Sequence, residues 1–492
     1  MGFGYIMIEK ITILKTPLRE HQLNNLRFHL LYPKTADWSD CGVGKTLIAL
    51  AKFELLRSAG AARTMLVVCP FSVIESWARE IEKHTSYSYI RLVGGLNAKL
   101  NLLNQAADIY LSTYDSIAGR RNTAGRLLLA LVDKKFDIII CDEATMIKSF
   151  GAQRTKALTV LCDTIPYSMF LSGTPITNNV ASIFTIYRAM DGGSTFGKNY
   201  FAIRNRYFKD IGTGFPKLVI KPELAHELRF RLFTRAIRIM KSECLQLPDQ
   251  IIMPRYCYLS IDQVKMYAII ASDIIKTLDL PEGKINVPNV LAKMAKLSQI
   301  TDGFMYTDDE TKIFTENPKI DLLRETIQLI PEGEKIVIYA RWIQDLNCIE
   351  KCCKEMGLPS VRIDGKTNLI DRGNFVDAFQ DDPNIKIFIA QEATGGYGIT
   401  LHSAWNAIYF SLTFAVIDYM QSTARIHRMG QVADKCCYYP LFGKDTIDEY
   451  IWQHLQGKVE VAQSLTDAVG RQRLKDNLYL IVGKENGETK TS

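Results

Sequence analysis

The sequence predicts an α/β protein with two parallel sheets, each flanked by helices, and three observations lead to this fold class. Short runs of β-branched and aliphatic residues alternate with helix-length segments, which is typical of strands buried on both faces of a parallel sheet. These runs fall into two groups, separated by a stretch with few of them. The chain has 492 residues, of which 47% are hydrophobic and 23% charged, so it can form two cores of ordinary size.

Strands are expected in the same pattern in both halves of the chain. In the first half they are 65–69, 109–113, 136–141 and 168–172, and in the second half 335–340, 386–390, 407–411 and 436–442. Few strands are expected between 192 and 318. Apolar residues there recur with the period of a helix, at positions 290, 291, 294, 297, 300 and 304. The short polar segment KTADWSD, before residue 41, makes a poor strand.

The net charge of +7 is unevenly distributed along the chain. Residues 204–241 contain ten Lys or Arg and three acidic residues. The net charge of this segment, 10 − 3 = +7, therefore equals that of the whole chain. A basic patch of this kind, with Tyr207 and Phe208 inside it, can face the phosphates of a nucleic acid. A solvated helical face explains the same composition, and the sequence leaves both interpretations open.

Cysteine and histidine usage argues against a zinc site or a disulfide framework. The eleven cysteines include two vicinal pairs but no CxxC, and only seven histidines are scattered along the chain. This pattern favours buried thiols in a reducing compartment. No apolar run reaches the ~20 residues of a membrane span, and the first ten residues lack the pattern of a signal peptide. We therefore expect a protein without membrane contact.

Residues 39–46, SDCGVGKT, resemble a phosphate-binding loop of the pattern G-x-x-x-x-G-K-[ST], although a serine stands at the first glycine position. Gly42 and Gly44 let a backbone curl closely around a phosphate. Lys45 is expected to reach the β- and γ-phosphates of a nucleotide and Thr46 to hold Mg²⁺. The helical pattern that follows places a helix N-terminus behind the loop, which favours anions. A simple glycine turn before a helix is the alternative.

A second signal is the pair Asp142-Glu143, which follows the strand expected at 136–141. An aspartate at a strand end can hold Mg²⁺ through water, opposite Thr46, and the adjacent glutamate can orient and deprotonate an attacking water. A helix N-cap is the structural alternative for such a pair. The strings SGTP and TGGYGIT also follow expected strands, at the edge where open parallel sheets bind ligands.

The third signal is MQSTARIHRMGQ in the second half. Gln421, Arg425 and Arg428 are spaced i, i+4 and i+7, so we expect them on one face of a helix. Two arginines there are either surface charge or charge partners for a nucleotide bound by the other half of the chain. An arginine in the second role is worth ~10³–10⁵ in rate.

Taken in this order, the motifs resemble a superfamily-two ATPase of the Swi/Snf type, and the resemblance extends from about residue 17 to 458. The first motif of that family reads D-E-M-G-L-G-K-T, so it does not use the missing glycine, although Ser39-Asp40-Cys41 departs from D-E-M. The resemblance implies two tandem RecA-like lobes and an ATP hydrolase, that is, a DNA-dependent ATPase or DNA helicase that uses ATP and Mg²⁺. FSLTFAVIDYMQ lacks the D-P-x-W-N-P of chromatin remodellers and is closer to compact bacterial and phage members.

The resemblance also assigns residues to roles. Catalysis is implied for Lys45, Asp142, Glu143, Gln421, Arg425 and Arg428, with Thr46 and Asp142 at the metal. ATP binding is implied for Gln22, which would face the adenine, and for Gly42, Val43, Gly44, Lys45, Thr46 and Gly398. DNA contacts are implied for Pro70, Ser72, Thr113, Tyr114, Asn178, Lys366, Thr367, Gly395 and Gly396. Coupling of hydrolysis to DNA grip is implied for Ser172, Gly173 and Thr174. Each of these short strings taken alone would more often be a turn.

TRAIRIMKSECLQLP resembles the segment that closes the first lobe of the family, which gives expected domain boundaries. We expect the first lobe at 1–245, with a basic helical insertion near 196–241. A helical insertion and the entry to the second lobe are expected at 246–318. The second lobe with a C-terminal brace helix is expected at 319–470, and a flexible tail at 471–492.

The sequence therefore predicts an ATP-dependent translocase or helicase on double-stranded or branched DNA, acting largely independently of base sequence. We expect a monomer in the cytosol of a bacterium or a phage-infected host, working in repair, recombination, replication or defence, because no chromatin-reading module is recognised. Thr145 stands where many relatives have histidine, which could alter the coupling of ATP to DNA. The alternatives are an ATP-gated DNA clamp or recruitment subunit, and an RNA helicase, for which H-R-x-G-R would be expected instead of HRMGQ.

Overall fold

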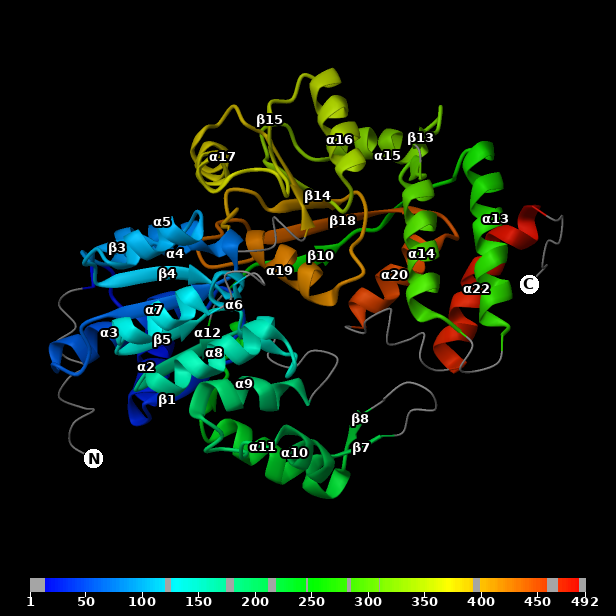
Figure 1. The fold of residues 1–492 in the computed structure, drawn as a ribbon. Coiled ribbons are helices and arrows are strands. Elements are labelled where there is room, and N and C mark those ends of the chain that lie inside the picture. Colours follow the sequence, from blue (N-terminus) through cyan, green and yellow to red (C-terminus); the bar gives the residue numbers. More distant parts are fainter. Residues whose placement is uncertain are drawn as a thin grey trace. The chain divides into compact units, whose positions relative to one another are not determined.

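The computed structural model describes residues 14–119, 125–173, 181–210, 218–244, 247–280, 285–308, 310–392, 399–457 and 468–485. The chain divides into two compact units (Figure 1). Unit 1 comprises Met1–Ile211 and Lys217–Gln246, and unit 2 contains Leu247–Ser492. The first-lobe boundary expected near 245 lies beside this division. Each unit is built on its own parallel sheet, so the predicted fold class is confirmed.

Unit 1 contains a seven-stranded sheet in the order β3-β4-β2-β5-β6-β1-β9, and all its pairs are parallel. Its strands are β1 (Lys34–Asp37), β2 (Met65–Cys69), β3 (Tyr89–Arg91), β4 (Ile109–Thr113), β5 (Ile138–Cys141), β6 (Tyr167–Leu171) and β9 (Ala236–Ile237). The four strands expected in this half are all present. The other three are short or polar, and the sequence pattern did not reveal them.

Strand β1 corrects the expectation that KTADWSD makes a poor strand. It is paired on both sides, with β6 and β9, and Thr35, Ala36 and Asp37 are fully buried. Its polar side chains are bonded inside the unit: the Thr35 hydroxyl lies 2.8 Å from Nδ1 of His29, and Asp37 accepts from Asn25. Buried polar groups are tolerated when they are hydrogen-bonded in this way, and hydropathy alone cannot detect it.

Helices cover the sheet of unit 1 on both faces, since its strands β2, β4 and β5 bury every side chain. One packed group contains α2 (Glu20–Leu31), α3 (Lys45–Ser58) and α4 (Ile74–His84). The other contains α5 (Leu96–Leu103), α6 (Tyr114–Ala118), α7 (Arg126–Lys134), α8 (Gln153–Thr164) and α9 (Ser182–Asp191). Short 3-10 helices, η1 (Phe71–Val73) and η2 (Ala144–Ile147), follow β2 and β5.

The basic segment near 196–241 is only partly helical, which corrects the expected helical insertion. It contains α10 (Tyr200–Tyr207), η3 (Pro222–Leu224), α11 (Ala225–Phe233) and α12 (Lys241–Cys244). Between α10 and η3 lie two antiparallel strands, β7 (Phe208–Asp210) and β8 (Leu218–Ile220). A three-residue strand is too short to produce a readable alternation of polar and apolar residues.

Unit 2 contains a second seven-stranded parallel sheet, in the order β10-β18-β17-β14-β16-β15, with β11 also paired to β18. Its strands are β10 (Asp249–Ile252), β11 (Arg255–Cys257), β14 (Ile336–Ala340), β15 (Ser360–Ile363), β16 (Ile387–Gln391), β17 (Asn406–Tyr409) and β18 (Lys435–Gly443). The four strands expected in this half are present. Residues 249–257 belong to this sheet, so they are not part of a helical insertion as expected.

The helices of unit 2 are α13 (Ile261–Leu278), α14 (Val287–Thr301), α15 (Pro318–Leu329), α16 (Ile343–Glu355), α17 (Leu369–Asp381), α19 (Val416–Ile426), α20 (Ile447–Gln456) and α22 (Ala468–Glu485). The antiparallel pair β12 (Phe304–Tyr306) and β13 (Thr311–Ile313) follows α14. Helix α22 packs against α13 and buries Leu474, Leu478 and Ile481, so a flexible tail from 471 is wrong for residues 471–485. The polar composition of the last residues concealed this helical spacing of apolar side chains.

None of the helices in the described ranges has the length and apolar character needed to cross a membrane.

Candidate functional site

The loop between β1 and α3 has the backbone conformation expected of a phosphate-binding loop. Gly42 and Gly44 both have φ of 93°, in the left-handed region that favours glycine. A Cβ atom on Gly44 would lie 2.1 Å from Nε2 of Gln22, so a side chain at this position would also displace the Gln22 amide. Gly44 is the N-cap of α3 and leaves the helix without a side-chain cap, so backbone N–H groups face the loop.

Lys45 begins α3 and folds back over the loop. Its Nζ donates to the backbone oxygens of Ser39, at 2.7 Å, and Asp40, at 2.9 Å. Thr46 follows in the first helical turn and is partly exposed. The ammonium group and the helix N-terminus therefore lie at the same loop, which is the arrangement that favours a bound phosphate.

A buried network below the loop holds its first residues in place. The Asp37 carboxylate accepts from Asn25 Nδ2 and from the backbone N–H of Ser39, both at 2.9 Å. Burial raises the pKa of Asp37, but hydrogen bonding and nearby positive charge outweigh it and lower the pKa overall. Ser39, which replaces the first glycine of the pattern, accepts from the N–H of Ile239 at 3.0 Å. The serine at this position is therefore used to fasten the loop, a role that the sequence did not reveal.

Gln22 is a brace of the loop in this structure. Its amide nitrogen donates to the Val43 carbonyl at 3.2 Å, and its amide oxygen accepts from the N–H of Arg19 at 2.9 Å. The side chain is 3% exposed. Contact of Gln22 with adenine stays a prediction, and His21 contacts the same carbonyl of Val43 at 3.2 Å.

Asp142 and Glu143 follow β5, as expected from their position at a strand end. The two carboxylate oxygens of Asp142 accept from Trp77 Nε1, at 2.8 Å, and from the N–H of Glu143, at 2.9 Å. Glu143 has a φ of 51°, which is uncommon for a residue with a side chain and costs energy. This conformation turns the chain sharply after Asp142, and strained residues of this kind cluster at functional sites.

Contact of Tyr114 with DNA stays a prediction, and in this structure the residue has an internal role. Its ring is 2% exposed and its hydroxyl donates to the Asp142 carbonyl at 2.7 Å, so it supports the Asp-Glu turn from inside the unit. Thr113 is also buried, and its hydroxyl caps α6 by accepting from the N–H of Ser116. Pro70 and Ser72 are partly exposed after β2 and keep the surface that a phosphate contact needs.

Ser172 and Gly173 follow β6 and touch the loop directly. The N–H of Ser172 donates to the Asp37 carbonyl at 3.0 Å, and a Cβ on Gly173 would lie 2.4 Å from Sγ of Cys41. The chain after β6 therefore lies in close contact with the loop. Five further predicted site residues lie outside the described residues: Thr174, Asn178, Gly395, Gly396 and Gly398.

In unit 2, the two predicted arginines converge on one acceptor. Arg425 Nη1 and Arg428 Nη1 each donate to the carbonyl of Ile399, at 3.2 Å in both cases, and Arg425 Nε donates to the Gln421 carbonyl at 3.1 Å. Helix α19 ends at Ile426, so Arg428 is not on the same helix face as Gln421 and Arg425, as was expected. The chain leaves the helix before Arg428, yet the turn still brings the two guanidinium groups together.

Lys366 and Thr367 lie in a tight turn after β15. The Asp364 carboxylate accepts from the N–H of Lys366 at 2.9 Å, while the N–H of Asp364 donates to the Thr367 hydroxyl at 3.0 Å. Arg372 fixes the turn from α17 by donating to the carbonyls of Asp364 and Thr367. The Lys366 side chain is exposed, so it is the member of this turn that can reach a phosphate.

The described residues contain no cluster of three or more His, Cys, Asp or Glu arranged to hold a metal ion. Mg²⁺ bound with a nucleotide does not require such a cage, because phosphate and water oxygens supply most of its ligands. The Thr46 hydroxyl and the Asp142 carboxylate are oxygen donors of the type that Mg²⁺ prefers, so the residues fit the ion. All eleven cysteines are free thiols.

Comparisons with known proteins agree with these motifs. The family model of the SNF2-related domain matches residues 38–303, and that of the helicase conserved C-terminal domain matches residues 318–430. The chain is 23% identical to ATP-dependent helicase fft3 of Schizosaccharomyces pombe, over 87% of this chain and 54% of the relative. It is 24% identical to ATP-dependent helicase FUN30 of Saccharomyces cerevisiae, over 96% of this chain and 49% of the relative.

The chain spans about half the length of the curated relatives it matches. A solved structure described as the Sulfolobus solfataricus SWI2/SNF2 ATPase core in complex with dsDNA is 24% identical and covers 97% of this chain and 98% of its own, with a TM-score of 0.43. The two curated relatives come from yeasts, and the expected likeness to bacterial or phage members is not shown. The model of the SNF2-related domain matches more than half of this chain, so the chain belongs to the SNF2-related family.

Proposed function

We propose that the chain is a DNA-dependent ATP hydrolase that moves along double-stranded DNA, including branched forms such as forks and junctions. One observation carries the hydrolase part. The phosphate loop, the Ser172-Gly173 segment and the Asp142-Glu143 pair follow β1, β6 and β5, which are neighbours in one parallel sheet. The carboxyl ends of parallel neighbours lie at the same edge, so the three segments form one site there.

In the proposed site, the loop of unit 1 binds the phosphates of ATP. Lys45 supplies a positive charge to the β- and γ-phosphates, and it exchanges its bonds with the loop carbonyls for bonds with phosphate oxygens. The N–H groups at the start of α3 add further donors, and the N-cap residue Gly44 has no side chain to cover them. Thr46 and Asp142 would hold Mg²⁺, and the bound ion would supply positive charge next to the phosphates.

Glu143 is the proposed general base. It orients a water molecule toward the γ-phosphate and accepts the proton that the water loses. Its neighbour Asp142 is held by Trp77 and by the N–H of Glu143, so both carboxylates have fixed backbones from which to act. Arg425 and Arg428 of unit 2 are the proposed charge partners for the same phosphates.

The proposed DNA partner follows from family membership and from exposed polar groups in both units. Pro70 and Ser72 in unit 1 and Lys366 in unit 2 are partly or fully exposed and can meet backbone phosphates without reading bases. Binding is therefore expected to be independent of base sequence. It should weaken with salt, with a slope of about −0.9 per phosphate contacted on duplex DNA.

The test is the rate of ATP hydrolysis with single-stranded, duplex, forked and four-way DNA of equal length, and with RNA. Stimulation by every DNA that contains duplex supports the proposal, and a higher rate on forks or junctions supports the branched preference. Equal stimulation by RNA or plain single strands contradicts a double-strand motor. DNA binding that depends on ATP without any turnover points instead to an ATP-gated clamp.

A further inference from the structure

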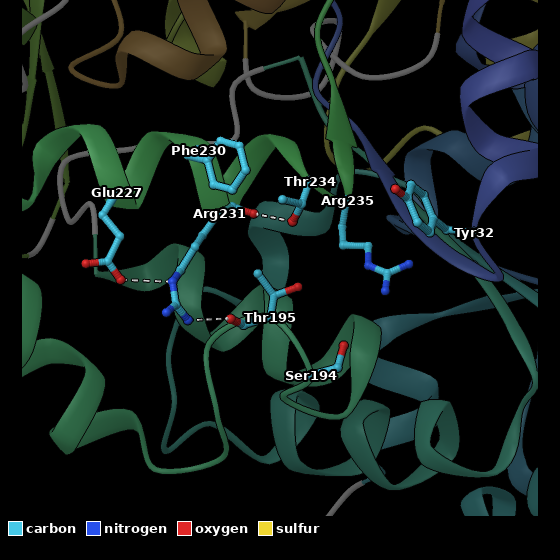
Figure 2. Close-up of a pocket in the computed structure, with 8 residues that line it drawn as sticks. All are labelled: Tyr32, Ser194, Thr195, Glu227, Phe230, Arg231, Thr234 and Arg235. Atoms are coloured by element: carbon cyan, nitrogen blue, oxygen red, sulfur yellow. Dashed lines mark hydrogen bonds and ion pairs between the residues drawn. The ribbon is translucent and has the colours of Figure 1, made fainter.

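Unit 1 contains a hollow of about 540 Å³ that lies outside the proposed ATP site (Figure 2). The end of α2, the loop after α9, helix α11 and the residues leading into β9 surround it. It is lined by Tyr32, Ser194, Thr195, Glu227, Phe230, Arg231, Thr234 and Arg235. A hollow of this volume is within the range of sites that take a small molecule or a single nucleotide.

Arg235 is a fixed cation in this hollow. Its guanidinium carbon lies 4.1 Å from the centre of the Tyr32 ring, and its backbone carbonyl accepts from the N–H of Ala36 in β1. Among the residues that the structure describes, no carboxylate or carbonyl accepts a hydrogen bond from its side chain. A guanidinium stacked on a ring keeps its N–H donors at its edge, in the geometry that suits a phosphate. The Ser194 side chain lines the same hollow (Figure 2).

The acidic side chain that lines the hollow is already neutralised. Glu227 bonds to Arg231 Nε and to Arg206, both at 2.9 Å, and accepts from the Tyr207 hydroxyl at 2.9 Å. Hydrogen bonds from Tyr207 and Arg206 lower the pKa of Glu227, so it stays ionised and is matched by arginines. The lining contains one carboxylate, Glu227, and two guanidinium groups, Arg231 and Arg235, so it carries a net charge of +1 and attracts anions.

An exposed aromatic ring also belongs to the lining of the hollow. Phe230 lines the hollow and is 67% exposed, although a phenylalanine gains free energy from burial. Phe230 also lines a second hollow, of about 440 Å³, together with His226 and Arg229 of the same helix. Aromatic faces alternating with cations bind successive bases and phosphates of a single strand. A buried duplex base pair offers no free face for such stacking.

We propose that this hollow binds one nucleotide of an unpaired DNA strand, with the phosphate at Arg235 and Ser194 and the base stacked on Phe230. The inference rests on the proposed DNA-dependent function and names the part of a branched substrate that unit 1 holds beside the motor. It also gives the basic segment 204–241 a role that a solvated helical face would not have.

The test compares fluorescence anisotropy of a labelled blunt duplex, the same duplex with a single-stranded arm, and the single strand alone. Arg235→Ala should weaken binding of the arm and the single strand and leave the blunt duplex unchanged. The slope of log K against log salt on the single strand should fall by about 0.7, the value for one phosphate contact. Lys156→Ala removes an exposed charge from α8 in the same unit and serves as the matched control.

Phe230→Leu separates stacking from apolar docking. Loss of a base stack should weaken arm binding about fivefold or more, whereas an acidic peptide with an apolar anchor would tolerate leucine. Wild-type-like binding of the single strand by both variants overturns the proposal, and so does equal weakening on the blunt duplex. Competition by free AMP at the affinity of the oligonucleotide would assign the hollow to a free nucleotide, which also overturns it.

These outcomes are separate from failure of the proposed function. Circular dichroism melting confirms that each variant folds, and ATP hydrolysis on blunt duplex should stay at the wild-type rate in both. If no DNA stimulates the wild-type protein, the motor function fails, and the difference in strand binding between the wild-type protein and Arg235→Ala still decides the role of the hollow.

Discussion

Units 1 and 2 are built on the same type of sheet, but burial shifts the pKa of a lysine downward in unit 1 and the pKa values of two acids upward in unit 2. In unit 1, Lys52 on α3 is fully buried, and burial lowers its pKa to about 7. Its Nζ has three oxygen neighbours at 3.4–3.5 Å, which are long contacts for an ammonium group. In unit 2, burial raises the pKa of Asp345 to about 7 and that of Glu392 to about 8. One unit therefore holds a lysine that loses its proton easily, and the other holds acids that keep theirs.

The difference follows from the charge of the partners, because the oxygens near Lys52 are carbonyl and hydroxyl oxygens, whereas Lys319 in unit 2 has carboxylate partners. Lys319 in unit 2 is shared by Asp302, at 2.8 Å, and Asp448, at 2.7 Å, so this one cation joins α15 to the end of α14 and to α20. Asp345 lies in the same acidic region and accepts from the Ser411 hydroxyl and the N–H of Trp342. Asp37 in unit 1 has N–H donors on both oxygens and stays ionised under the loop. Burial is the largest influence on both carboxyls and raises the pKa of each, and only at Asp37 do hydrogen bonds and nearby positive charge outweigh it.

The largest effect is expected from a change in the phosphate loop, because unit 1 is the unit proposed to bind the phosphates of ATP. Lys45→Ala should abolish both ATP binding and hydrolysis, because the phosphate charge is no longer matched in the loop. Equilibrium binding of a fluorescent ATP analogue and a steady-state hydrolysis assay measure the two effects. Lys156→Ala should change neither. Retained ATP binding in Lys45→Ala would mean that the backbone of the loop suffices and that unit 1 is not the phosphate-binding unit in the way proposed.

The matching change in unit 2 should act on turnover alone. Arg428→Ala should keep the fold, ATP binding and DNA binding but lose DNA-stimulated hydrolysis by ~10³-fold or more, the size reported for an arginine charge partner. Arg428→Lys should not restore it, because lysine lacks the planar guanidinium that shares the Ile399 carbonyl with Arg425. Lys435→Ala, an exposed charge at the start of β18, is the control. Full activity of Arg428→Lys would make Arg428 a plain surface charge.

A smaller loss of ATP hydrolysis is expected when the proposed general base, Glu143, is replaced. Glu143→Gln should bind ATP normally and hydrolyse it ~10²-fold more slowly, since a general base contributes about that much. The amide keeps the size of the side chain, so the turn after Asp142 is preserved. Asp115→Asn, at an exposed carboxylate in α6, should have no effect on turnover. Near-normal ATP hydrolysis by Glu143→Gln would show that Glu143 is not the general base.

The sequence predicted the frame of both units and the place of the phosphate loop, because apolar runs and glycine spacing are local signals. It missed β1, whose polar side chains are satisfied by partners distant in sequence, and α22, whose apolar spacing is diluted by polar neighbours. Tyr114 was assigned to DNA from its place in a motif, whereas its hydroxyl donates to the Asp142 carbonyl inside the unit. The hydrogen bond from the N–H of Ile239 to the Ser39 hydroxyl joins residues 200 positions apart, and no local sequence pattern can predict such a bond.

The smallest expected effect is the response of each unit to pH, and its sign differs between them. Unfolded lysine has a pKa of 10.5 and Lys52 in the fold one of about 7. Between these values the unfolded chain binds a proton that the folded unit does not, so unit 1 should become more stable as pH rises from 7. Asp345 and Glu392 have raised pKa values in the fold. The folded unit 2 therefore binds protons that the unfolded chain has lost, and it should become less stable as pH rises from about 4 to 8.

Buried cysteines in both units allow the two responses to be measured in one sample. Cys69 and Cys162 in unit 1 and Cys353 and Cys436 in unit 2 are buried free thiols that react with a thiol reagent only after unfolding. Urea titrations at pH 6, 7.5 and 9, each followed by a labelling pulse and mass spectrometry, give a midpoint for each unit. Lys52→Met should remove the increase in the stability of unit 1 with pH, which amounts to at most about 5 kcal/mol between the two pKa values of this lysine. Glu392→Gln should reduce the decrease in the stability of unit 2 with pH. Midpoints that shift in the same direction in both units would show that these buried charges do not set the pH response, because Lys52 and the two acids act with opposite signs.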